Sequence, residues 1–269
     1  MQDKKKELQI YVVYHCTKYV PFETFLIFVN NYKKYSSDYK HKLIVCFKNL
    51  DLKEIRKYTK KLLGINYIKF VDKVKINDFD IGSYKRIATK YRNAILIFLS
   101  GHSYPIVKNW IKILMKHYKE DRIIVPTASY ESMRDLPFNL RNNLIKNLYQ
   151  KLIFFNNFLG FPNPHFRTSS FVISANNFLK YPFKKITTKN DTHLMESGKN
   201  NMYQFYKKLR VETFVVNSDG KKFNEKNWKK SKTYASGNQK KLIISDNRTR
   251  KFEKLKGNFK QRKSLLVWG

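Results

Sequence analysis

The stretch from Asn77 to Ser132, NDFDIGSYKRIATKYRNAILIFLSGHSYPIVKNWIKILMKHYKEDRIIVPTASYES, decides the fold class of this chain. A polar, glycine-containing loop leads into a helix-like run at 83–91, an unbroken apolar run at 94–99 and a polar turn at 100–103. A second helix-like run and the apolar run 122–125 follow. Continuous apolar runs of this length are typical of strands buried on both faces, and intervening helices favour parallel pairing. The stretch therefore predicts consecutive strand and helix units in one sheet.

The same alternation extends outward in both directions. Toward the N-terminus, we expect strands at 8–15, 42–47 and 67–71 and helices at 22–35 and 52–63. Toward the C-terminus, we expect strands at 169–174, 211–216 and 242–245 and helices at 139–158, 176–180 and 200–209. This order predicts an α/β fold: a mainly parallel, twisted sheet flanked by helices, with ligands bound at the carboxyl ends of the strands.

Charge and composition narrow the function classes. The 269 residues include 55 Lys and Arg against 20 Asp and Glu, a net charge of +35, and 42% are hydrophobic. A chain this apolar folds, and a surface this basic attracts phosphates, anionic lipid and nucleic acid. An overall abundance of Lys, Asn, Ile, Phe and Tyr explains the charge equally well without any ligand. The charge alone therefore assigns no partner.

Targeting and redox features are sparse. No apolar run approaches the roughly 20 residues that a transmembrane helix needs, and the basic start does not read as a signal peptide, so we expect a cytoplasmic protein. The basic surface allows peripheral contact with the inner face of an anionic membrane. Cys16 and Cys46 form neither a metal-ligand pattern nor a disulfide framework, which predicts two buried thiols.

Several catalytic motifs are absent from the sequence. It contains no P-loop, no dinucleotide-binding glycine fingerprint, no nucleophile elbow and no HExxH. Kinase, dehydrogenase and hydrolase functions therefore lack support.

The order of elements in 77–132 resembles the nucleotide-sugar half of GT-A fold glycosyltransferases, specifically the family-2-like bacterial enzymes. The segment from Arg167 to Lys208 extends the likeness, with the strand SFVIS, a short helix and the motif Met195-Glu196-Ser197-Gly198 before another helix. The resemblance covers about residues 8–210. It implies a GT-A-like, Rossmann-like domain at 1–217, with a nucleotide-sugar half at about 1–130 and an acceptor half at about 131–217. Residues 218–269 would form a small C-terminal subdomain or flap.

The resemblance also implies donor-binding positions at strand ends and in the loops that follow them. These positions are His15, Asp80, Gly82, Ser83, Lys85, Ser100, Gly101 and His102.

Two positions depart from the family pattern. Where the family has its metal-binding Asp, the chain reads Leu99-Ser100-Gly101-His102-Ser103, and the second strand ends in Phe47-Lys48-Asn49 instead of a base-reading Asp. Mg²⁺ and Mn²⁺ prefer carboxylate oxygens, so the sequence offers no strong metal site and we assign no metal ligand. Backbone N–H groups and His102, with Lys85 or Arg86, could bind a diphosphate instead.

Glu196 is the candidate catalytic base. Inverting sugar transfer needs a carboxylate that accepts the proton of the attacking acceptor hydroxyl. We expect Glu196 in a loop at a helix entrance, where its alternative role is that of a capping acid. Asp191 is a nearby alternative base, and His165 and Arg167, in a proline-rich segment before a strand, are candidate acceptor-binding residues. The tail residues Trp228, Tyr234, Asp246-Asn247-Arg248 and Trp268 could form a flap over the donor. Alternatively, the two tryptophans form a small core and Asp246-Asn247 a turn.

Three functions remain open. The first is a glycosyltransferase of surface polysaccharide biosynthesis that uses a nucleotide-sugar donor and a glycan or lipid-linked acceptor. The second is a basic nucleic-acid-binding α/β protein, in which Tyr and Phe between Lys residues would stack on bases. Nucleic acid is the less favoured partner, because these aromatic residues fall largely on predicted core faces. The third is a non-catalytic glycosyltransferase-like scaffold, which the missing Asp residues favour.

Overall fold

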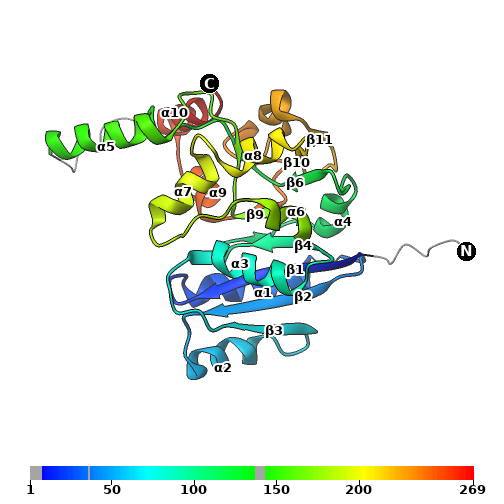
Figure 1. Ribbon diagram of the computed structural model, residues 1–269. Coiled ribbons are helices and arrows are strands. Elements are labelled where there is room, and N and C mark those ends of the chain that lie inside the picture. Colours follow the sequence, from blue (N-terminus) through cyan, green and yellow to red (C-terminus); the bar gives the residue numbers. More distant parts are fainter. Residues whose placement is uncertain (1–7, 36, 137–142) are drawn as a thin grey trace, which may run out of the picture.

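The computed structural model describes residues 8–35, 37–136 and 143–269 (Figure 1). The strands are β1 (Gln9–Thr17), β2 (Lys42–Lys48), β3 (Tyr67–Asp72), β4 (Ala94–Leu99), β5 (Tyr104–Pro105), β6 (Arg122–Val125), β7 (Ala128–Ser129), β8 (His165–Phe166), β9 (Ser170–Ser174), β10 (Glu212–Val216), β11 (Lys222–Phe223) and β12 (Ile244–Ser245). The α-helices are α1 (Phe22–Lys34), α2 (Leu52–Lys61), α3 (Phe79–Lys90), α4 (Trp110–Met115), α5 (Leu144–Asn157), α6 (Ala175–Lys180), α7 (Lys189–Ser197), α8 (Met202–Lys208), α9 (Asn247–Glu253) and α10 (Gly257–Trp268). Two 3₁₀ helices cover Glu225–Ser231 and Gly237–Gln239.

Eight strands form the main sheet in the order β11-β10-β6-β9-β4-β1-β2-β3. The pairs β3–β2, β2–β1, β1–β4 and β6–β10 are parallel, whereas β9 runs antiparallel between β4 and β6 and β11 is antiparallel at one edge. The predicted fold class, a mainly parallel α/β sheet flanked by helices, is confirmed. Because β9 is antiparallel, its first residue lies at the edge where β4 ends.

The apolar runs are buried on both faces of the sheet, as their composition predicts. Along β1, Tyr11 and Val13 join one core cluster and Val12 and Tyr14 join the other, since successive side chains of a strand point to opposite faces. Helices α3, α6 and α8 contribute to the first cluster, and α1, α2 and α4 contribute to the second. All six residues of β4 are buried, so this strand is a central member of the sheet.

Some predicted boundaries were wrong. Helix α3 begins at Phe79 instead of residue 83, α4 ends at Met115 before residue 118, and β12 has two residues instead of four. The predicted helix 139–158 corresponds to α5, and its expected first residues 139–142 lie outside the described residues. Helices α7, α9 and α10 were not predicted.

The C-terminal segment joins the rest of the molecule at several points. Strand β11 extends the main sheet, β12 pairs with β5, and the Trp268 indole donates to the Tyr234 carbonyl at 2.8 Å. Cys16 and Cys46 are free and buried, as predicted. Among the helices in the described ranges, none is long and apolar enough to cross a membrane.

Candidate functional site

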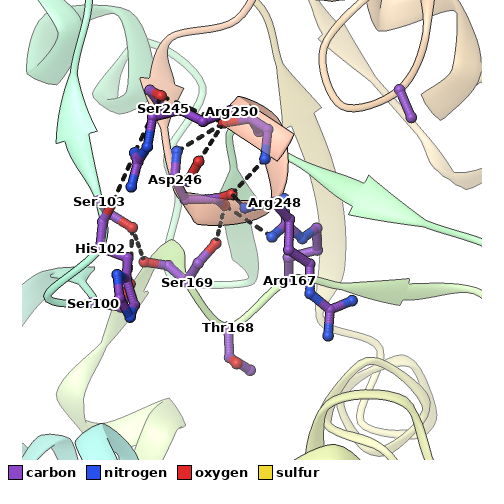
Figure 2. A network of polar contacts seen from close by, with 12 residues as sticks. Ser100, His102, Ser103, Arg167, Thr168, Ser169, Ser245, Asp246, Arg248 and Arg250 are labelled. Atoms are coloured by element: carbon purple, nitrogen blue, oxygen red, sulfur yellow. Dashed lines mark hydrogen bonds and ion pairs between the residues drawn. The ribbon is translucent and has the colours of Figure 1, made fainter. Parts of the chain in front are cut away.

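The turn after β4 and Glu196 meet at the carboxyl edge of the sheet, through two residues that precede β9. The backbone N–H of Ser100 and the hydroxyl of Ser103 both donate to the Ser169 carbonyl, each at 2.9 Å. The hydroxyl of the adjacent Thr168 donates to Glu196 Oε2 at 2.5 Å. Figure 2 shows the turn, Thr168 and Ser169 together. The two candidate halves of the site therefore share one edge of the fold.

Glu196 lies in the last turn of α7, and not in a loop before a helix as the sequence predicts. This position excludes the capping role, because an acid stabilises the N-terminal end of a helix. Burial alone would raise the pKa of Glu196, but the positive charges of Arg248 and Arg167 and the hydrogen bond from Thr168 outweigh it, so the pKa is lowered. The carboxylate is therefore ionised at neutral pH.

Asp80, near the start of α3, is a second carboxylate of this site. Removal from water raises the pKa of Asp80 to about 6, and the charge of Glu196 contributes to the rise. Two interacting carboxylates whose surroundings shift their pKa values in opposite directions are a frequent feature of acid–base sites.

Helix α9 brings cationic side chains to the same edge. Pairing of β12 with β5 holds α9 beside the turn, and Arg250 Nη1 donates to the His102 carbonyl at 3.1 Å. Arg248, on the same helix, lowers the pKa of Glu196. The segment Asp246-Asn247-Arg248 was expected near the donor as part of a flap, but its charge effect on Glu196, some 50 residues earlier in the chain, was not predicted.

Arg167 connects this helix to the start of β9. It is 3% exposed, and its guanidinium forms an ion pair with Asp246 at 2.9 Å and lies 4.3 Å from the ring centroid of Tyr234. Asp246 also accepts from the Ser169 hydroxyl at 2.7 Å and from two backbone N–H groups of α9 (Figure 2). Nε and Nη1 of Arg167 have no hydrogen-bond partner within the described part of the chain. Its predicted contact with an acceptor stays a prediction.

A buried ionic network lies beneath the ends of β1, β2 and β3. Lys48 Nζ contacts Asp78 at 2.6 Å and Asp72 at 3.2 Å, and its side chain is 1% exposed. Arg86 contacts the same two carboxylates, Asp72 at 2.5 Å and Asp78 at 2.7 Å. Lys48, which stands where the family has its base-reading Asp, is thus bound inside the protein.

Three predicted donor-binding residues belong to this network. The Ser83 hydroxyl donates to Asp72 at 2.6 Å and lies 3.3 Å from His15 Nε2. Burial and the charge of Lys48 lower the pKa of His15 to about 3. A Cβ at Gly82 would lie 2.0 Å from the Asp78 carboxyl carbon, so glycine allows this carboxylate to pack on α3. These residues belong to the buried network at the ends of β1, β2 and β3. Their contact with a donor stays a prediction.

The remaining predicted residues lie around the edge. Gly101 packs closely, since a Cβ there would lie 2.7 Å from the His15 carbonyl, and its own carbonyl accepts from the Tyr14 hydroxyl at 2.7 Å. His102 is half-buried, and burial lowers its pKa. The exposed Lys85 has its ammonium 5.4 Å from the ring centroid of Phe183.

His165 and Asp191 have local partners. His165 is buried with Nδ1 2.8 Å from the Asn163 carbonyl, and burial lowers its pKa despite the charge of Glu196. Asp191 forms a capping box with Thr188 at the start of α7, and these hydrogen bonds lower its pKa. This position occupies Asp191 in helix capping, and its role as a base stays a prediction.

The residues at this edge do not fit a divalent cation. Within the described ranges, no three or more His, Cys, Asp and Glu side chains form a group that could hold a metal ion. The edge holds the two carboxylates of Glu196 and Asp80, but the turn itself offers hydroxyl groups and His102, and the charged neighbours from α9 are arginines. Such a set of donors suits an anion such as a diphosphate.

Fold and site together define a mainly parallel α/β protein with an acidic pair and an arginine cluster at the carboxyl edge of its sheet. No protein-family model matches the chain, and no curated protein matches it significantly. Among solved structures, it is similar to GalNAc-T7 with UDP, GalNAc and Mn²⁺, with 12% identity and a TM-score of 0.44. That match covers 71% of this chain and 41% of the GalNAc-T7 chain, so the chain spans less than half of that protein.

Two further solved structures are similar. The galactosyltransferase LgtC in complex with donor and acceptor sugar analogues has 10% identity and a TM-score of 0.38, covering 70% of each chain. The 4-diphosphocytidyl-2C-methyl-D-erythritol synthase of Anaerococcus prevotii has 9% identity and a TM-score of 0.46, covering 80% of this chain and 90% of that one. These likenesses concern the fold and assign no activity.

Proposed function

We propose that the protein is a glycosyltransferase that moves a sugar from a nucleotide-sugar donor to a hydroxyl group of a glycan or lipid-linked acceptor, without a divalent cation. The observation that carries the proposal is the link through Thr168 and Ser169, which joins the ionised Glu196 to the turn after β4. Donor and acceptor would then meet between that turn and α7.

In this proposal, the arginines of α9 supply the positive charge that a divalent metal ion would otherwise supply. Arg248, Arg250 and the backbone N–H groups of Gly101 and His102 bind the donor diphosphate and stabilise the charge that develops on it as it leaves. Such fixed positive groups act strongly in a site from which water is excluded.

Glu196 accepts the proton of the acceptor hydroxyl as its oxygen attacks the anomeric carbon. The new bond joins acceptor oxygen and anomeric carbon, while the bond from that carbon to the diphosphate breaks and its electron pair leaves with the nucleoside diphosphate. A single displacement inverts the anomeric configuration. Asp80 shares the site and, as part of residues 1–130, would bind the donor by hydrogen bonding.

The remaining parts of the proposal concern organisation and place. Residues 1–130 would bind the donor, 131–217 the acceptor, and 218–269 would cover the donor through α9. We place the reaction in surface polysaccharide biosynthesis, on the cytoplasmic side of a membrane.

The test compares Glu196→Gln with Glu23→Gln, a matched change at an exposed glutamate of α1. Release of nucleoside diphosphate is measured across a panel of nucleotide sugars, with water or glycans as acceptor. We expect Glu196→Gln to keep donor binding and to lose about 100-fold or more in transfer, as removal of a general base does. Full activity of Glu196→Gln would contradict the assignment. Donor binding without turnover in the wild type would favour the scaffold, and sequence-specific oligonucleotide binding at high salt would favour the nucleic-acid alternative.

A further inference from the structure

Helix α5 exposes a continuous apolar surface. Its exposed large side chains, which we call the α5 stripe, are Leu144 (66%), Ile145 (79%), Leu148 (49%), Tyr149 (67%), Leu152 (65%) and Phe155 (54%). At 3.6 residues per turn these positions fall within about 140° of the helix circumference, so they form one face. Figure 1 shows α5 projecting from the body of the protein. An exposed apolar patch of this kind marks an interaction surface.

The helix is fixed to the body by its second half. Lys151 Nζ donates to the Arg134 carbonyl at 3.1 Å, and the Asn157 carbonyl accepts from the Lys199 backbone at 2.9 Å. The Arg134 guanidinium lies 4.0 Å from the ring centroid of Phe155, which places a positive charge at the margin of the stripe. The stripe is therefore held in place while remaining exposed.

A lysine-rimmed cavity adjoins the end of α5. It has a volume of about 530 Å³ and is lined by Asn156 and Asn157 together with residues of α7, α8 and the preceding loop. Its apolar lining includes Ile186, Leu194 and Phe205. The lysines at this cavity are Lys184, Lys185, Lys199 and Lys208, all exposed.

Positive charge predominates around this cavity and α5. None of the four lysines has an ion-pair partner among the residues that the structure describes. Helix α5 contains no acidic residue, and the carboxylate of Asp191, which also lines the cavity, accepts hydrogen bonds from Thr187 and Thr188. An apolar helix face next to unpaired lysines complements a surface of hydrocarbon beneath phosphate groups.

We propose that the α5 stripe inserts into the interfacial region of a bilayer that contains anionic lipids, and that the four lysines bind headgroup phosphates. A second copy of the chain is a poorer occupant, because its α5 contains no acidic side chain that could pair with these lysines. Vesicle binding needs no sugar donor, so this proposal and the transferase proposal can fail separately.

The first experiment measures flotation of the full-length protein with phosphatidylcholine vesicles, with and without phosphatidylglycerol, at physiological ionic strength. The variant Leu148→Glu with Leu152→Glu is compared with Leu52→Glu and Leu63→Glu, two leucines on and after α2 that are 73% and 76% exposed. We expect the α5 variant to lose about tenfold or more in binding to anionic vesicles and the α2 variant to stay near wild type. Equal losses in both would overturn the proposal, because the added charge alone would then explain them.

The second experiment reports insertion directly. The three native tryptophans are at most 5% exposed, so a tryptophan in Tyr149→Trp is the one that lipid can reach. We expect a blue shift of its emission when anionic vesicles are added, and none with Leu63→Trp. Absence of the shift at α5 contradicts insertion.

The lysines are tested by Lys184→Ala with Lys185→Ala against Lys60→Ala with Lys61→Ala, an exposed pair at the end of α2. The first pair should weaken anionic-vesicle binding several-fold more than the second, since charge close to the surface contributes most. Equal weakening overturns the role of the cavity lysines. A stable dimer that the α5 glutamates dissociate, with no vesicle binding, would instead assign the stripe to a second copy.

Discussion

The ion pair between Arg167 and Asp246 fixes α9 to the candidate site, and Asp246→Asn tests it. Both side chains are almost fully buried, at 4% and 3% exposure, and their charged atoms are 2.9 Å apart. At that separation and an effective dielectric constant of about 20, Coulomb's law gives about 6 kcal/mol of attraction. Desolvation of the two charges offsets part of this. The loss of one partner from such a pair costs about 3–5 kcal/mol, which is a large part of a typical total stability.

Asparagine isolates the charge because it can keep the helix cap. Oδ1 of Asp246 accepts from the backbone of Arg248 and Thr249 at 2.8 and 2.9 Å, and an amide oxygen can do the same. We therefore expect a melting temperature lower by about 10 °C, measured by circular dichroism, with urea unfolding giving the free energy. The control is Arg167→Met combined with Asp246→Asn, which leaves no unpaired guanidinium and should be more stable than Asp246→Asn alone. A loss below about 1 kcal/mol, or simple additivity of the two single changes, would refute the reasoning.

Two further predictions concern α3. Gly82→Ala should destabilise the protein by about 2 kcal/mol or more, because its Cβ would lie 2.0 Å from the Asp78 carboxyl, whereas Gly160→Ala, with no atom nearer than 3.7 Å, should be close to neutral in urea unfolding. Similar stabilities for the two variants would contradict the packing described. The raised pKa of Asp80, about 6 in the folded state, means that folding favours its neutral form, so the stability contributed by this form is lost as pH rises through about 6. Asp80→Asn should therefore be more stable than wild type at pH 7, with a gap that closes below the unfolded pKa of about 4. A variant less stable at pH 7 would contradict the raised pKa of this carboxyl group.

The central strands could be predicted because unbroken apolar runs such as 94–99 belong to strands buried on both faces. The antiparallel direction of β9 could not, since it depends on how the long connection from β6 returns to the sheet. Helix α7 was missed because it follows a Lys- and Thr-rich segment and contributes few buried apolar side chains, although its capping pair Thr188 and Asp191 was a local signal.

Only part of the candidate site could be predicted from the sequence. Glu196 and the turn at 100–103 were singled out by resemblance, and the structure brings them to one edge. The arginines of α9 depend on the pairing of β12 with β5, a tertiary contact between short segments with no local pattern. Likewise, nothing in an apolar strand predicted that Lys48 at its end would be buried among carboxylates.

The central claim is that arginines, not a metal ion, hold the donor diphosphate at the edge that Glu196 shares. Isothermal titration with nucleoside diphosphates and nucleotide sugars, in EDTA and in Mn²⁺, tests it most directly, with Arg248→Gln compared to Lys251→Gln, an exposed change on the same helix. The account predicts equal affinity in EDTA and Mn²⁺ and a loss of about tenfold in Arg248→Gln alone, as expected for one charge-assisted contact. Binding that requires Mn²⁺, or that is unaffected by Arg248→Gln, would contradict it.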